Sequence, residues 1–283
     1  MTTPLDVAAR LTRLAIALEM REGVTAPVLA AIAASGGRGD VVVGAAAHGR
    51  RMDIVMPWSP AGLAALGGDA AKLPAGVAPV GIRARVDGDA VSAAVLARGG
   101  AADPRGAVDE LAPPAARAAW FDVVDQFCAI AGGKIGGKTR WLDGRVALEI
   151  RYPARDPAAN TDAYLLEAVD QLGAQLGVTA PQRALWQKLH VGFRGVELAL
   201  TTACTAGGAV SQVLALAYPL TEWERAVHMA QGTTLDAAEA AKVPRQLGAL
   251  AGALGSDQLQ SVELELGPHE PLEVVVWAKL APA

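Results

Sequence analysis

The stretch AGGKIGGKTRWLDGRVALEIRYP, residues 131–153, decides between two kinds of fold. From Gly132 to Thr139 it satisfies the G-x-x-x-x-G-K-[ST] pattern, in which backbone N–H groups hold phosphates and the lysine, here Lys138, meets the terminal ones. Such a phosphate loop follows a buried strand and precedes a helix. The residues on either side of the pattern therefore determine what it means.

The flanking sequence reverses that order. Apolar residues recur at helical spacing before the pattern, and Gly132-Gly133 stands where a helix C-cap is expected; these residues are Trp120, Val124, Phe127, Cys128 and Ala131. After it, Asp143-Gly144 predicts a hairpin turn between strands at 138–142 and 145–152. The pattern is therefore preceded by a predicted helix and followed by a predicted hairpin, and this order disfavours a phosphate loop.

Composition limits the function classes. The chain has 283 residues, of which 52% are hydrophobic and 19% charged, as in a well-buried folded protein. Its net charge of −4, without a basic run, argues against a nucleic-acid partner. We expect no membrane span, because Gly, Pro or charged residues interrupt every apolar run. The cysteines Cys128 and Cys204 lie in apolar segments, so we expect a reducing, cytoplasmic location.

The unit of helix followed by hairpin recurs along the chain about five times, close to the period of known repeat architectures. The predicted hairpins cover residues 40–48 with 52–58, 80–86 with 89–98, 138–142 with 145–152, 190–202 with 209–218, and 259–266 with 272–280. A long antiparallel sheet removes its exposed edges by closing. We therefore predict an α+β fold, a closed antiparallel barrel of about ten strands with helices outside, as a single domain over residues 1–283.

The strands alternate, so their apolar positions should meet the helices and the opposite phase should line the interior. That opposite phase contains Asp53, Arg83, Arg85, Lys138, Arg140, Arg145, Glu149, Arg151, Glu197, Ser211, Glu263, Glu265, Glu273, Trp277 and Lys279. Cations from different hairpins could converge on a diphosphate, with the acids orienting them or binding Mg²⁺. A solvated sheet face or an internally paired ion network is the alternative interpretation, and the pattern leaves both open.

The order of elements resembles that of the ABBA aromatic prenyltransferases, whose barrel of ten antiparallel strands is built from five repeats with helices outside. RMDIVM at 51–56 is similar to the strand in which soluble bacterial members place a metal-associated Asp, which implies Asp53 as its counterpart. The run LLEAVDQLG at 165–173, leading to the strand at 190–202, is similar to a helix-to-strand passage of the family.

The resemblance implies diphosphate-binding cations on successive strands, at Arg83 or Arg85, at Lys138 or Arg140, and at Arg194 or Lys188. It also implies transfer of an allylic prenyl group from a diphosphate to a small aromatic acceptor, with Mg²⁺ as the candidate cofactor. The candidate substrate-binding residues are Arg83, Arg85, Lys138, Arg140, Arg151, Lys188, Arg194, Glu149, Glu197, Ser211, Trp277 and Lys279, with Asp53 as the candidate metal ligand.

No residue is assigned a catalytic role from the sequence. The chain has only three Tyr and three Phe, and Tyr152 shares the helix-facing phase, so the aromatic groups that would shield a carbocation are not identified. The alternative is a non-catalytic barrel or repeat module that binds an apolar small molecule or a protein partner.

Overall fold

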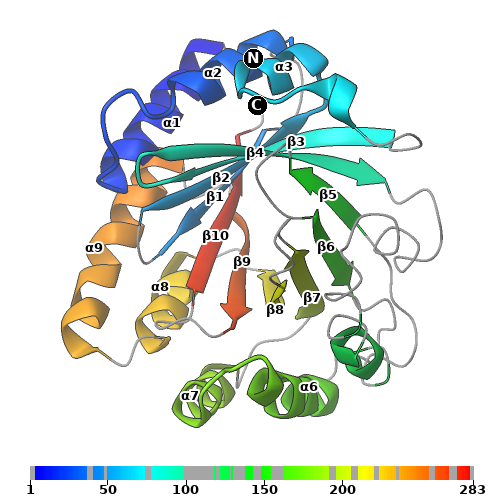
Figure 1. Cartoon of the computed structure of the whole chain (residues 1–283). Coiled ribbons are helices and arrows are strands. Elements are labelled where there is room, and N and C mark those ends of the chain that lie inside the picture. The colour runs from blue at the N-terminus through cyan, green and yellow to red at the C-terminus, as the bar shows by residue number, and fades with distance from the viewer. Residues whose placement is uncertain are drawn as a thin grey trace.

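The computed structural model places the strands at the centre of the molecule and the helices around them (Figure 1). It describes residues 4–36, 41–47, 50–73, 78–98, 118, 122–127, 129, 138–142, 148–153, 162–190, 196–204, 210–219, 223–233, 236–254, 259–267 and 273–280. None of the helices in these ranges has the length and hydropathy of a membrane span.

The N-terminal elements form two units of helices followed by a hairpin. In chain order they are α1 (Pro4–Ala17), α2 (Ala26–Ala34), β1 (Val42–Ala46), β2 (Arg51–Pro57), α3 (Pro60–Ala65), the 3₁₀ turn η1 (Ala70–Lys72), β3 (Ala78–Asp87) and β4 (Ala90–Arg98). Sequence signals set the boundaries. Ser59 caps α3 by accepting a hydrogen bond from the Gly62 N–H at 3.1 Å. Gly88 turns β3 into β4 with a φ of +57°.

The same unit continues to the C-terminus. The remaining elements are β5 (Lys138–Leu142), β6 (Leu148–Pro153), α6 (Asp162–Gln175), α7 (Ala180–His190), β7 (Glu197–Cys204), β8 (Val210–Pro219), α8 (Trp223–Gly232), α9 (Ala237–Leu254), β9 (Leu259–Leu266) and β10 (Glu273–Lys279). Residues 122–127 are helical before β5, and Val124 and Phe127 are buried. The predicted repeat of helix and hairpin is therefore present.

Each strand pairs antiparallel with the next one in the chain, and β1 pairs with β10, so the hydrogen-bonded order closes on itself. The closing pairs include Val43 with Ala278 and Gly44 with Trp277. Closure satisfies the backbone groups that an open sheet would leave at its two edges. The predicted closed α+β barrel is confirmed.

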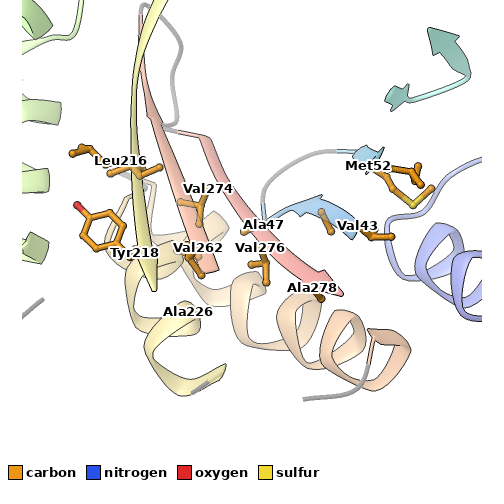
Figure 2. Packing of buried hydrophobic residues seen from close by; sticks show 14 of the residues in the cluster. Val43, Ala47, Met52, Leu216, Tyr218, Ala226, Val262, Val274, Val276 and Ala278 are labelled. Carbon is orange, nitrogen blue, oxygen red and sulfur yellow. The ribbon is translucent and has the colours of Figure 1, made fainter. Parts of the chain in front are cut away.

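The apolar phase of the strands packs against the helices, as expected. Ile54 and Ile82 are fully buried, and a Cβ on Gly62 of α3 would lie 3.3 Å from the Ile82 side chain. Figure 2 shows Val262 and Val276 on the side of β9 and β10 that faces α8 and α9. Alternate residues on the same strands must therefore face the barrel interior.

Two sequence expectations are corrected and one is confirmed. The strand expected from His190 begins at Glu197, because α7 continues to His190. The strand expected over residues 40–48 is shorter, from Val42 to Ala46. Lys138 and Thr139 belong to strand β5, so in the described residues the Gly-Lys-Thr pattern leads into a strand, where a phosphate loop would lead into a helix.

Candidate functional site

A buried carboxylate gathers three arginines on the inner wall of the barrel. Asp53, fully buried on β2, accepts hydrogen bonds with both of its oxygens. Arg51 Nε lies 2.9 Å from Oδ2, and Arg85 Nε lies 2.8 Å from Oδ1. Arg83 contacts both oxygens, with Nε 2.9 Å from Oδ1 and Nη2 2.8 Å from Oδ2. These four residues are the arginine cluster.

The strand register explains why these side chains meet. Residues two apart on a strand point to the same face, which aligns Arg51 with Asp53 and Arg83 with Arg85. Asp53 stands opposite Arg85 on β3 and opposite Gly44 on β1. Because Gly44 has no side chain, long side chains from neighbouring strands can occupy the space beside the Asp53 carboxylate.

Charge decides the protonation state of Asp53. Burial by itself would raise the pKa of its carboxyl, but the guanidinium of Arg83, followed by those of Arg85 and Arg51, outweighs this effect. The pKa of Asp53 is therefore held far below its ordinary value of 3.8. The carboxylate is therefore ionised at neutral pH, and it fixes the directions of the arginines.

Arg51 also ties the cluster to the other end of the chain. Its Nη1 and Nη2 each lie 3.2 Å from an oxygen of Glu265 on β9. Because β1 and β10 separate β2 from β9 in the strand order, this bidentate pair spans two strands along the inner wall. Arg51 is thus committed to two carboxylates.

Arg85 differs from Arg51 and Arg83 in the exposure of its side chain. Its side chain is 36% exposed, compared with 10% for Arg51 and 6% for Arg83. It binds Asp53 through Nε, and no other partner of its guanidinium exists among the described residues. Its two terminal nitrogens thus have no partner in the described part of the chain, and an anion could accept hydrogen bonds from both.

Trp277 on β10 lies next to the arginine cluster. The Arg83 Cζ atom lies over its ring, 5.7 Å from the centroid, within the range of a cation–π contact. Of the aromatic residues on the described strands, Trp277 is the one whose register places it in the phase of Asp53. Its Nε1 is buried without a hydrogen-bond partner. The wall thus combines guanidinium donors with one aromatic face.

Asp53 does not have the surroundings of a metal ligand. Guanidinium donors already occupy both of its oxygens, and a divalent cation prefers a set of several oxygen ligands. The described residues include no group of three or more His, Cys, Asp or Glu side chains able to hold a metal. The geometry here fits an anchor for arginines.

The remaining predicted residues fall into three groups. In the first, only the backbone register is described: Lys138 is opposite Arg98 and Arg151, and Arg140 is opposite Glu149. Ser211 likewise stands opposite Ala203. These positions continue the phase of Arg83 around the barrel, because facing residues of a ladder share a side of the sheet.

The second group is described but lies away from the arginine cluster. Lys188 is exposed on helix α7, so the structure does not bring it to the inner wall. Glu197 is exposed at the first residue of β7, whereas Lys279 is half-buried at the last residue of β10. The third group, Arg194 and Arg145, lies outside the described residues.

Two residues of the site were not predicted. Arg51 shares the phase of Asp53, but the hairpin strand is expected to begin at Met52, so Arg51 is not among the residues predicted to line the interior; the observed strand begins at Arg51. Starting the alternation one residue earlier would have found it. Gly44 was missed because its role depends on Trp277, more than two hundred residues later in the chain. No local signal marks it.

Solved structures with the same architecture cover nearly the whole chain. The 5-dimethylallyltryptophan synthase from Streptomyces coelicolor aligns over 97% of this chain and 96% of its own, with a TM-score of 0.62 and 12% identity. Its complex with DMASPP and Trp gives a TM-score of 0.63 at 12% identity, over 97% and 94% of the two chains. The fold is the PT barrel.

The PT-barrel prenyltransferase PriB, in a ternary complex with L-tryptophan and dimethylallyl thiolodiphosphate, gives a TM-score of 0.59 at 14% identity, over 97% of this chain and 95% of its own. The sequence matches no protein-family profile and no curated protein. At such identities the similarity concerns the fold, and the chemistry has to be argued from the residues of the arginine cluster.

Proposed function

We propose that this PT-barrel protein transfers an allylic prenyl group from a diphosphate donor to a small aromatic acceptor inside the barrel. The observation that carries the proposal is the Arg85 guanidinium, whose terminal nitrogens have no partner among the described residues. It offers two N–H-bearing nitrogens to the interior from a position that Asp53 fixes. A guanidinium fork in a partly dry site is well suited to phosphate oxygens.

The arginine cluster is suited to stabilising a leaving diphosphate. Three guanidinium groups, held by the carboxylates of Asp53 and Glu265, lie together on the inner wall, so a diphosphate beside them would meet charged donors. Arg51 and Arg83 are held in place by these acids and support Arg85 without reorganisation during the reaction. Donors fixed before the charge develops stabilise it most effectively.

The proposed reaction follows from this placement. The allylic C–O bond breaks, and its electron pair leaves with the diphosphate, which Arg85 binds. The allylic cation then accepts an electron pair from a ring carbon of the acceptor, which forms the new C–C bond. That ring carbon afterwards loses its proton to the released diphosphate. The Trp277 ring lies beside the arginine cluster and would border the place where the cation forms.

Tryptophan is the first acceptor to test. Two of the structures that share this fold hold tryptophan together with a thio-analogue of dimethylallyl diphosphate. The reaction is checked by incubating the protein with dimethylallyl diphosphate and tryptophan and looking for the prenylated amino acid and released diphosphate. Parallel reactions with EDTA in place of Mg²⁺ test whether a divalent cation is required.

The decisive measurement is binding of the unreactive dimethylallyl thiolodiphosphate to the wild type and to Arg85→Gln. Loss of charge-assisted hydrogen bonds worth about 1.5–3 kcal/mol should weaken binding by about 10- to 150-fold. Arg13→Gln is the matched control, because Arg13 is exposed on α1 and bonds only to the Ala9 carbonyl in the described part of the chain. It should leave the affinity unchanged.

Equal affinities for wild type and Arg85→Gln would remove the assigned role of Arg85. If the wild type binds no prenyl diphosphate and forms no product, the enzyme proposal fails. Binding of an apolar probe without diphosphate affinity would then support the non-catalytic barrel.

A further inference from the structure

The ring of Trp277 rests on the bare backbone of Gly44. A Cβ built on Gly44 would lie 2.8 Å from Cζ3 and 2.9 Å from both Cε3 and Cη2 of the indole. Real Cβ atoms essentially never approach other heavy atoms so closely. The six-membered ring therefore occupies the space that any side chain at position 44 would need.

The backbone around Trp277 is also adapted to this arrangement. Trp277 is opposite Gly44 on β1 and Ser261 on β9, and the β9–β10 register shifts immediately after it. The shift leaves Gln260 as an extra residue between Ser261 and Leu259. Bulges of this kind re-aim neighbouring side chains and are frequent beside active sites.

The position of the ring relative to the arginines gives it a function. Arg83 contacts the indole face and Asp53, and Asp53 in turn contacts Arg85. A diphosphate held at the free end of Arg85 would therefore place the first carbons of its alkyl chain near Trp277. How far the ring projects from the wall would then determine the room left for that chain.

We propose that the Gly44–Trp277 pair sets the length of prenyl chain that the barrel accepts. Gly44 lets the ring lie against β1, which keeps the space beside the arginine cluster open. A side chain at position 44 pushes the ring inward and shortens that space, whereas a smaller residue at position 277 lengthens it. This inference rests on the proposed prenyl diphosphate site, and it identifies the residues that select among prenyl diphosphates of different chain length.

The test compares dimethylallyl and geranyl thiolodiphosphates, which carry the same diphosphate on chains of five and ten carbons, by calorimetric titration. Gly44→Ala should weaken binding of the geranyl compound by about tenfold more than binding of the dimethylallyl compound. Trp277→Leu should shift the ratio of the two affinities the other way. Trp277→Leu replaces the indole by a smaller side chain and creates no clash. It therefore tests the inference even if Gly44→Ala folds poorly.

Two further variants sharpen the result. Gly248→Ala on α9 is the matched control, because a Cβ there meets nothing within 4 Å, and it should leave the ratio unchanged. The double variant Gly44→Ala with Trp277→Leu should regain geranyl affinity relative to Gly44→Ala alone. An unchanged ratio in both single variants, with a wild type that binds either compound, overturns the Gly44–Trp277 assignment alone. A wild type that binds neither overturns the proposed function as well.

Discussion

At the scale of single residues, Asp53 is the centre of the site. Its carboxylate is fully buried, yet it remains ionised because three guanidinium groups contact it. A buried charge of this kind is stable only while its partners remain in place. The inner wall therefore depends on Asp53 for its shape, and Arg85 depends on it for its direction.

Replacing Asp53 by Asn should destabilise the protein at neutral pH by about 3–5 kcal/mol, because the arginines would face one another without their common anion. Urea denaturation at pH 7 measures the loss in the free energy of unfolding. Asp170→Asn is the control, since Asp170 is exposed and, among the described residues, pairs only with Arg183, at 3.4 Å. That change should cost less than about 1 kcal/mol.

The pH dependence of the Asp53 contribution follows from its lowered pKa. Above the unfolded-state pKa of 3.8 the carboxylate contributes its full stabilisation, because it is ionised in both states. As the pH falls below that value the unfolded state takes up a proton that the folded state does not, so stability declines toward the lower folded pKa. The wild type should therefore lose more stability than Asp53→Asn between pH 5 and 3; parallel curves would contradict this.

At the scale of elements, helix α7 is fixed to strand β8 by one buried hydrogen bond. Trp186 Nε1 donates to the Tyr218 hydroxyl at 2.8 Å, and both side chains are buried. Burial raises the pKa of Tyr218 well above 10, and the hydrogen bond from Trp186 only partly offsets this, so the hydroxyl is neutral in the folded protein. Its neighbour across the ladder is Val262, which faces the helices.

Tyr218→Phe should lower the free energy of unfolding by about 1–3 kcal/mol, because it removes the oxygen that accepts the indole N–H in a buried position. Thermal and urea denaturation measure the change. Tyr164→Phe provides the comparison, since Tyr164 lies on α6 with 36% of its surface exposed and should tolerate the change. Equal stability of both variants would show that the Trp186 contact adds nothing.

At the scale of the whole molecule, closure joins the first strand to the last. The Ala47 N–H donates to the Val274 carbonyl and the Leu280 N–H donates to the Val41 carbonyl, each at 2.7 Å. Together with the β1–β10 ladder, these bonds leave neither strand with an unpaired edge.

Hydrogen exchange followed by NMR tests this closure directly. The amides of Ala47 and Leu280 should exchange as slowly as that of Ala84, which lies inside the β2–β3–β4 region. In an open sheet the outer amides of β1 and β10 would face water and exchange much faster. Fast exchange confined to these amides would thus argue for an open sheet.

The sequence alone determined the local structure of this protein and the phase of its strands. Turn residues and alternation predicted the hairpins and placed Asp53, Arg83, Arg85 and Trp277 on one face, because periodicity is a property of neighbouring residues. It also disfavoured the phosphate loop, since the order of helix and hairpin around Lys138 is local information.

Only the tertiary structure decided which of those residues act together. The family resemblance implied that Asp53 binds a metal ion. In the structure, the register of β2 against β3 brings arginine side chains to its carboxylate. Gly44 and Trp277 meet solely because β1 pairs with β10. Such contacts join residues far apart in the chain, and their energies depend on distance and burial, which no local pattern specifies.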